Sequence, residues 1–242
     1  MANHTVDGSD RTLLSPIPEQ KSLAAHAYQR IKSLVLNSVL DENVRLTEER
    51  LSQQLGISKT PVREALKRLE AEGLIRVSSR RGTYVANFDP DTVVEIYDLR
   101  EILEIGAIQL ARGRITRDIV QRLRAIVEEG ERYAEAGDVE AYNRLDVVLH
   151  DLLVECSDNG RLLAVYRNLV DQIQLVRLRT VRIGKRVKRS SNEHRELVEA
   201  LAANDLHRAE AVLRQHISSA KVDMLALLAE GSISAAQQRM KG

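Results

Sequence analysis

The sequence is poor in cysteine, aromatic residues and proline: its 242 residues include one Cys, no Trp, one Phe and four Pro. The single cysteine, Cys156, cannot form a disulfide within the chain. No apolar stretch approaches the roughly 18 residues that a membrane-spanning helix needs, and the first twenty residues lack the apolar core of a signal peptide. These absences argue against a disulfide-stabilised secreted protein and against a membrane protein, so we expect a cytoplasmic protein with no membrane partner.

Charge of both signs is plentiful and nearly balanced. Lys and Arg number 36 and Asp and Glu 35, which gives a net charge of +1, so the charge of the whole chain indicates no partner. The distribution is uneven, because residues 21–85 contain 12 basic and 7 acidic residues, whereas residues 86–242 contain 23 and 25. Basic charge is therefore concentrated in the N-terminal third of the chain, as is common in proteins with a nucleic-acid-binding segment.

Helical periodicity covers most of the chain. Leu, Ala, Glu and Arg are abundant, and 43% of the residues are apolar, which is enough for a substantial buried core. The segment NFDPD interrupts the periodicity with a proline and two aspartates and marks a domain boundary. We expect a mainly α protein with a flexible tail at 1–18, a first domain at 19–86, a linker at 87–91, an all-helical bundle at 92–230 and a C-terminal tail at 231–242.

The bundle is expected to contain about six helices. The apolar spacing places them at residues 91–112, 116–136, 138–156, 159–182, 191–203 and 205–229. Residues suited to cap the N-termini of four of these helices are Asp138, Asn159, Ser191 and Asp205.

The first domain has the order of a winged helix-turn-helix. The stretch LTEERLSQQLGISKTPVREALKRLEAEGLIRV contains a short helix, a turn near Gly56 and a second helix that begins at Ser58 or Lys59. Residues 74–77 and 83–85, separated by SSRRG, predict a small β-hairpin, or wing. Lys59, Thr60 and Arg63 are then exposed at the start of the second helix, where a recognition helix meets DNA. The alternative, a small helical subdomain with solvated arginines, is disfavoured because all these features occur together in the right order.

This stretch, followed by RRGTYV, resembles the winged-helix domain of the GntR family of bacterial transcription regulators over nearly all of residues 20–86. The resemblance implies that the recognition helix contacts operator DNA through four residues and the wing through two: Ser58, Lys59, Thr60, Arg63, Arg81 and Gly82. Two departures concern Lys59, where the family usually has Arg, and Glu42 and Asn43, which replace a common Pro-Gly. A lysine cannot make the bidentate contact that a guanidinium makes to guanine, so the first departure affects base preference.

Three predicted helices each turn ionisable side chains inward. Asp146 and His150 lie one turn apart along the edge of an apolar face, and His194 and His216 lie among apolar residues of two later helices. Burying such groups without partners costs several kcal/mol, so we expect them to bind one another or a shared cation. One carboxylate oxygen and three imidazole nitrogens suit Zn²⁺, with Ni, Mn or Fe as alternatives. Ordinary hydrogen-bonded core histidines are the competing interpretation.

The same four residues match a family pattern. Residues 91–230 resemble the FCD effector-binding domain of the FadR subfamily, in which an Asp-x3-His pair and two later histidines hold a metal. The resemblance assigns the metal to Asp146, His150, His194 and His216. Some members of the subfamily lack these ligands and bind acyl-CoA, so their presence here indicates the metal-dependent branch.

Arg100 falls on the apolar stripe of the first helix of the bundle, where a permanent charge needs an anionic partner. The residues alone leave two options open: a pair with Glu104 one turn later, or an anionic ligand. The family resemblance implies the second, because related domains bind an effector carboxylate with an arginine in this R-x-x-L-E context. Gln172, on the inward edge of its helix, is a further candidate for the effector cavity.

These features predict a metal-dependent, ligand-responsive DNA-binding transcription regulator, a repressor rather than an enzyme. We expect a homodimer that binds a two-fold symmetric operator and senses a small carboxylate. Two alternatives remain at this point. One is a metal-sensing regulator without an organic effector, and the other is a metallohydrolase fused to a DNA-binding domain, since an Asp/His3 site can activate water.

Overall fold

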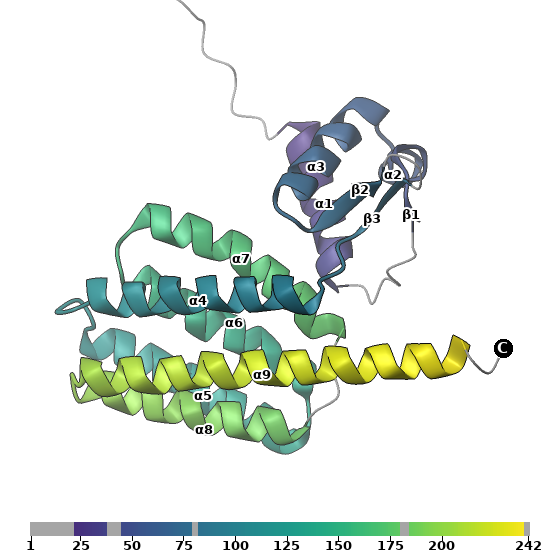
Figure 1. The fold of residues 1–242 in the computed structure, drawn as a ribbon. Coiled ribbons are helices and arrows are strands. Elements are labelled where there is room, and N and C mark those ends of the chain that lie inside the picture. The colour runs from purple at the N-terminus through teal and green to yellow at the C-terminus, as the bar shows by residue number, and fades with distance from the viewer. Residues whose placement is uncertain (1–21, 38–44, 79–81, 180–183, 240–242) are drawn as a thin grey trace, which may run out of the picture.

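A computed structural model describes residues 22–37, 45–78, 82–179 and 184–239. It is mainly helical, with one small sheet in the N-terminal third, as the sequence predicts (Figure 1). Two predictions fall outside the described residues: the flexible tail at 1–18, and the DNA contact of Arg81 in the wing. In the part of the chain that the structure describes, no helix is both long and apolar enough to cross a membrane.

The N-terminal domain packs three helices against a three-stranded antiparallel sheet. The helices are α1 (Leu23–Asn37), α2 (Glu48–Leu55) and α3 (Lys59–Ala71), and the strands β1 (Arg45–Leu46), β2 (Ile75–Ser78) and β3 (Gly82–Val85). Gly56 ends α2 in the left-handed region at φ 67°, which makes the tight turn between α2 and α3 possible. The predicted hairpin is β2–β3, whereas β1 was missed because two residues carry no alternation that a sequence pattern could reveal.

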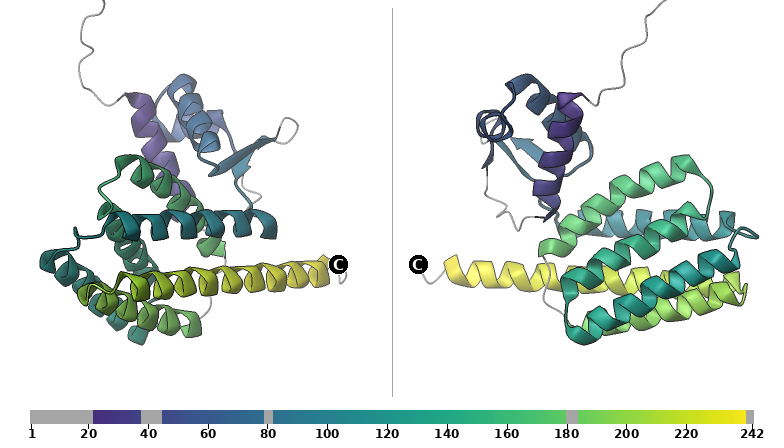
Figure 2. Two further views of the ribbon diagram at one scale, coloured as in Figure 1. Left: turned by 60° about the vertical axis from the view of Figure 1, so that its left-hand side comes forward. Right: turned by 180° about the vertical axis from the view of Figure 1, so that it is seen from behind.

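Within the described residues, six helices form the C-terminal bundle, the number predicted. They are α4 (Pro90–Leu110), α5 (Arg117–Ala136), α6 (Val139–Glu155), α7 (Gly160–Arg179), α8 (Gly184–Ala202) and α9 (Leu206–Arg239). Helix α5 packs against α6 and α8, α9 against α8 and α4, and α4 also against α6 and α7 (Figure 2). Because α6, α8 and α9 each present one face to this interior, side chains far apart in sequence meet there.

Several helix ends match the prediction and two differ. Asp138, Asn159 and Asp205 accept hydrogen bonds from backbone N–H groups two or three residues later and cap α6, α7 and α9. The predicted cap at Ser191 is wrong, because α8 begins at Gly184 and Ser191 is a buried residue inside it. The predicted tail is also wrong as far as residue 239: α9 continues through the Gly- and Ser-containing stretch beyond 229 and extends past the bundle (Figure 1).

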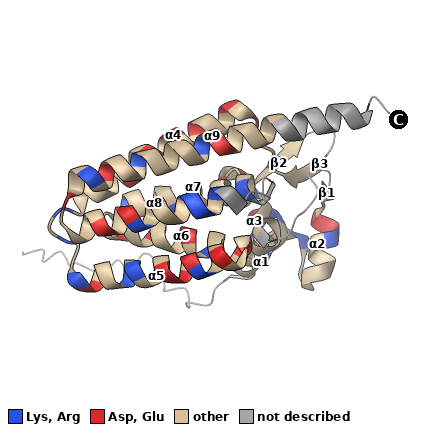
Figure 3. Ribbon diagram, turned by 90° about the horizontal axis from the view of Figure 1, so that it is seen from below, with Lys and Arg blue, Asp and Glu red and all other residues tan. Residues whose placement is uncertain are grey.

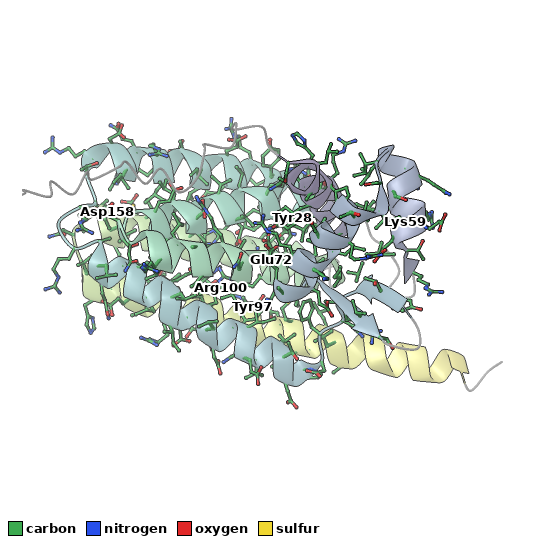
Figure 4. All side chains as sticks on the ribbon, turned by 90° about the horizontal axis from the view of Figure 1, so that it is seen from above. Tyr28, Lys59, Glu72, Tyr97, Arg100 and Asp158 are labelled. Atoms are coloured by element: carbon green, nitrogen blue, oxygen red, sulfur yellow. The ribbon has the colours of Figure 1, made fainter. Side chains whose placement is uncertain are left out.

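The two domains meet where α7 lies against α1 and the end of α3. Gln172 on α7 donates a hydrogen bond from Nε2 to the Glu72 carbonyl over 3.0 Å. Lys32 on α1 forms ion pairs with Asp171 on α7 and with Glu72, and the Tyr28 hydroxyl donates to Glu72 Oε2 over 2.6 Å. Tyr28 and Glu72 accordingly lie next to each other beside the bundle in Figure 4.

Candidate metal centre and nucleic-acid interface

The structure brings the four predicted metal-binding side chains to one point. Asp146 and His150 project from α6, His194 from α8 and His216 from α9, and one ligand atom of each lies within 4.8 Å of all the others. All four are at most 5% exposed. His194 Nε2 lies 3.3 Å from His150 Nε2 and 3.5 Å from Asp146 Oδ1. Four donor atoms of the types that bind first-row divalent ions thus converge in the interior.

The outer nitrogen of every imidazole is held by a further side chain. His150 Nδ1 lies 2.6 Å from Glu104 Oε2, and His216 Nδ1 lies 2.8 Å from Glu193 Oε2. A carboxylate only accepts, so both Nδ1 atoms carry the proton and both Nε2 lone pairs face the centre.

The outer nitrogen of His194 is also held by a side chain, here the phenol of Tyr142. Its Nδ1 lies 3.3 Å from the Tyr142 hydroxyl, which itself donates to Ser190 Oγ over 2.8 Å. The hydroxyl oxygen is therefore left to accept from Nδ1–H, and the Nε2 lone pair of His194 also points inward. Outer hydrogen bonds of this kind fix the tautomer and the ring orientation of metal-binding histidines.

The protonation states suit a cation. Burial holds the pKa values of His194 and His216 well below the usual imidazole range, so both rings are neutral at neutral pH. Among the described residues nothing hydrogen-bonds to the buried His216 Nε2, although such atoms are nearly always paired. A neutral imidazole with an unused inward lone pair is what a metal ion requires, so these residues fit the implied metal.

Asp146 is held in its charged form. Arg177 on α7 donates from Nη1 to Asp146 Oδ2 over 2.5 Å. Although burial opposes the charge, Arg177 keeps the pKa of Asp146 well below its usual range. One carboxylate oxygen is thereby occupied by Arg177, while Oδ1 remains on the side of the histidines.

Arg100 pairs with Glu104, which is one of the two options that the sequence left open, and one of its other nitrogens has no partner among the described residues. Its Nε donates to Glu104 Oε1 over 2.6 Å, and both side chains are at most 2% exposed. Although burial opposes the charge, the Arg100 guanidinium lowers the pKa of Glu104 to about 2. Within the described residues, the buried Arg100 Nη1 has no hydrogen-bond partner. The two options left open by the sequence are therefore compatible, because Glu104 binds one edge of the guanidinium and another nitrogen is left for an anion.

Gln172 lies elsewhere than predicted. Its amide is engaged with the Glu72 carbonyl at the contact between the domains, and not with Arg100 or the histidines. The sequence analysis did not identify the side chains that hold the four candidate metal ligands in place. These are Tyr142, Arg177, Glu193 and Glu104, the last of which was predicted only as a partner of Arg100. Each of these side chains contacts a ligand residue on a different helix, so it could be identified only once it was known which helices are neighbours.

The predicted DNA-contacting residues of the recognition helix are exposed. Ser58, Lys59, Thr60 and Arg63 lie at the N-terminal end of α3, at the far side of the domain from the bundle, as Lys59 shows in Figure 4. Ser58 occupies the N-cap position without a side-chain cap hydrogen bond. Lys59 pairs with Glu49 over 2.6 Å and Arg63 with Glu48 over 2.7 Å, all on the surface. Exposed pairs of this kind are weak, so DNA phosphates can replace the two glutamates.

The base of the wing contains a glycine that no other residue can replace without strain. Gly82 has φ +106°, and a Cβ atom there would overlap the guanidinium of Arg45 on β1. Arg81 lies outside the described residues. Arg45 is an exposed basic residue beside the wing that the sequence analysis did not single out.

The bundle, by contrast, offers no single-sign surface on the side seen in Figure 3. Acidic and basic residues are interspersed along α5, α8 and α9 there. DNA is therefore expected to engage the N-terminal domain and not this face of the bundle.

Comparisons with known proteins agree with this division. Residues 95–219 match the model of the FCD domain, and residues 23–85 match that of bacterial regulatory proteins of the gntR family. The chain is 27% identical over 206 residues to an uncharacterized HTH-type transcriptional regulator, YdhC, of Bacillus subtilis, covering 84% of this chain and 92% of the relative. It is 24% identical over 184 residues to the gluconate operon transcriptional repressor of the same organism, covering 74% and 75%.

Among solved structures, E. coli McbR/YncC is similar with a TM-score of 0.73 and 23% identity, covering 85% of this chain and 98% of that one. At this identity the likeness establishes the shared fold. It supports the order of a winged helix followed by a helical bundle along almost the whole of both chains.

Proposed function

The chain belongs to the gntR family of bacterial regulatory proteins and carries an FCD domain, and from this premise we propose that it is a repressor controlled by a divalent metal ion and a small organic acid. DNA binding and transcription regulation follow from the family itself. Relatives are named as transcription regulators, and three of them as operon transcriptional repressors, so the metallohydrolase alternative is dropped.

The convergence of four ligand atoms carries the metal part of the proposal. Asp146, His150, His194 and His216 would hold the ion. His216 Nε2, which has no hydrogen-bond partner among the described residues, is the observation that hydrogen-bonded core histidines do not explain. When bound, a divalent ion supplies a Lewis-acidic centre that attracts a carboxylate oxygen. The donor set suits Zn²⁺ and also Ni²⁺, Mn²⁺ or Fe²⁺.

Arg100 carries the organic-acid part. A metal-sensing regulator without an effector would need only the four ligands, whereas Arg100 presents a buried, unpartnered Nη1 among the described residues. A charged hydrogen-bond donor of this kind is suited to a carboxylate. The Glu104 that binds Arg100 also binds His150, so the arginine and the metal ligands form one connected site.

Helix α7 offers a route from this site to the DNA-binding domain. Arg177 near its end holds Asp146, while Asp171 and Gln172 on the same helix contact Lys32 and Glu72 of the N-terminal domain. A ligand that changes the position of Arg177 therefore acts on the helix that supports the winged helix. We infer that the effector releases DNA by shifting this contact between two arrangements.

An exposed apolar stripe on α4 supports the homodimer that a two-fold symmetric operator requires. Leu99, Ile102 and Leu110 are 40%, 69% and 47% exposed, and they recur at helical spacing with Gly106 between them. Apart from neighbouring backbone of α4 itself, no described atom lies within 4 Å of where a Cβ would stand on Gly106, so another helix can approach closely there. We propose that a second copy of α4 covers this stripe.

One combined experiment tests the metal and effector proposals. Metal content of the purified protein is measured by plasma mass spectrometry, beside a His150→Ala, His194→Ala double variant. DNA binding to the region upstream of its own gene is then measured by electrophoretic mobility shift, with and without small carboxylic acids. We expect about one ion per chain, lost in the variant, and a specific shift that an acid reverses only when metal is present. No metal uptake after reconstitution would refute the metal site, and a shift that responds to metal alone would favour the metal sensor.

A further inference from the structure

The lysine that begins the recognition helix lies beside a carboxylate on the same exposed surface. Lys59 is the first residue of α3, and Glu49 lies in the first turn of α2. Lys59 Nζ donates to Glu49 Oε2 over 2.6 Å, and the two side chains are 51% and 64% exposed. Figure 4 shows Lys59 on the part of the N-terminal domain that is far from the bundle. A hydrogen-bond donor and an acceptor are therefore presented together where DNA is expected to bind.

The neighbouring ion pair between the same two helices is built differently. Glu48 accepts from both Nε and Nη2 of Arg63, over 2.9 and 2.7 Å, so one whole edge of that guanidinium is occupied. Lys59 makes a single bond to Glu49, which leaves two of its three ammonium hydrogens for other acceptors. The Glu49 carboxylate can also accept further hydrogen bonds. Of the two pairs, Lys59–Glu49 is thus the one with hydrogen-bonding capacity left for base edges.

A carboxylate on a DNA-binding surface needs a hydrogen-bond donor opposite it, because the phosphates repel its charge. In the major groove the donors are the amino groups of cytosine and adenine. Guanine offers a lysine two adjacent acceptors, O6 and N7, whereas thymine carries a methyl group beside its one acceptor, O4. In a G·C pair, guanine O6 and cytosine N4 share a hydrogen bond and so lie about 2.9 Å apart. An acceptor and a donor at this spacing match Lys59 Nζ and Glu49 Oε2.

Resting on the operator binding of the repressor proposed above, we propose that Lys59 and Glu49 together read one G·C base pair in each half-site. Lys59 donates to guanine O6 and N7, and Glu49 accepts from cytosine N4. A lysine alone reads guanine less sharply than an arginine, because an ammonium lacks the rigid fork of a guanidinium. Glu49 supplies the missing discrimination, since any base pair that turns guanine or thymine toward it sets one acceptor against another.

The test begins with the full-length protein and a library of random duplexes, from which the bound sequences are enriched and read. Fluorescence anisotropy then measures the Kd for the enriched duplex and for duplexes altered at single base pairs. We expect one position in each half-site where G·C binds about tenfold more tightly than A·T. Replacing that guanine by inosine changes only the minor-groove edge, so the preference should persist. Its loss on inosine would overturn reading through the major groove.

Variants connect the two side chains to that position. Glu49→Ala and Lys59→Ala should each reduce the preference to about threefold or less at the same base pair, and the double variant should reduce it no further. The readout is the ratio of the two Kd values, because removal of a carboxylate also raises the affinity for any DNA. Glu70→Ala is the control, since it removes the same charge from an exposed position near the other end of α3, and it should keep the full preference.

The outcomes separate this inference from the function on which it rests. A preference that Glu49→Ala leaves unchanged, or changes at a different base pair from Lys59→Ala, would overturn the shared reading of one G·C pair while leaving operator binding intact. If the unaltered protein enriches no sequence, the result would count against operator binding itself.

Discussion

The three buried imidazoles differ in what holds their outer nitrogen. The carboxylates of Glu104 and Glu193 hold the Nδ1 atoms of His150 and His216, whereas the phenol of Tyr142 holds that of His194. Glu104 is fully buried and is also bound by Arg100, whereas the side chain of Glu193 is 16% exposed. Glu193 is therefore the outer partner whose removal disturbs the fold least.

The first prediction concerns that glutamate. Glu193→Ala is expected to lower zinc affinity about 10-fold or more, because His216 loses the group that fixes its tautomer and orientation. Competition against a chromophoric chelator measures the Kd. Glu196→Ala, an exposed residue on the same helix, is the control and should bind zinc like the unaltered chain. Equal affinities for the two variants would mean that Glu193 does not orient a metal ligand.

The second prediction concerns the recognition helix. Arg63 is exposed and paired with Glu48, so Arg63→Ala should leave the unfolding temperature unchanged. If Arg63 contacts phosphate, the slope of log K against log salt for duplex binding becomes shallower by about 1. Fluorescence anisotropy at several salt concentrations provides the slope. Arg144→Ala removes an equally exposed charge from the bundle, and an identical change in both variants would contradict a local contact.

At the scale of elements, helix faces could be predicted from sequence more reliably than helix ends. The inward positions of Asp146, His150, His194 and His216 follow from apolar spacing alone, and the structure places them together. The start of α8 was missed because its first turns carry the run KRVKRSS, which has little apolar pattern. What holds that segment in the helix is tertiary packing, including the buried Val187.

The supporting residues of the site could not be predicted for a related reason. Glu104 and His150 are 46 residues apart, and Arg177 and Asp146 are 31 apart. Periodicity shows that each residue faces inward without showing which helices become neighbours. Gln172 was wrongly assigned to the effector cavity. A helix edge that packs against another domain has the same apolar spacing as an edge that lines a cavity, so the sequence pattern could not tell the two apart.

The third prediction concerns the contact between α3 and α7. Gly73 has φ +70°, and a Cβ there would lie 2.9 Å from Gln172 Nε2. Gly73→Ala should therefore cost the strain of a left-handed alanine, about 1 kcal/mol, and roughly 1 kcal/mol more for the displaced Gln172 hydrogen bond. Gly56→Ala, with φ +67° and open space, isolates the strain. Denaturant unfolding measures the loss of unfolding free energy in each variant. The larger loss in Gly73→Ala should fall to that of Gly56→Ala when Gln172 is also replaced by alanine. A difference that persists in the Gln172→Ala background would have another source.

At the scale of the whole molecule, the exposed apolar stripe on α4 is the proposed interface of the homodimer that a two-fold symmetric operator requires. The fourth prediction is that Ile102→Lys shifts the protein from dimer to monomer, because a charge is placed at the centre of the proposed interface. Sedimentation velocity at micromolar concentration measures the state. Val165→Lys on α7, where the valine is 50% exposed, is the control and should remain dimeric. A monomeric unaltered protein would refute the proposed homodimer, and a dimeric Ile102→Lys variant would place the interface elsewhere.

The contact of α7 with the N-terminal domain also bears on the construction of hybrid regulators. A chimera that joins this bundle to a foreign winged helix at residues 87–91 would keep Asp171 and Gln172 but lose Lys32 and the Glu72 carbonyl position. Under the function proposed above, such a hybrid would lack the α7 contacts through which a change at the effector site would reach the DNA-binding domain. A hybrid should therefore keep the residues on the DNA-binding side of this contact, Tyr28, Lys32, Glu72 and Gly73, together with the bundle. Only then would it retain the proposed dependence of DNA binding on the ligand.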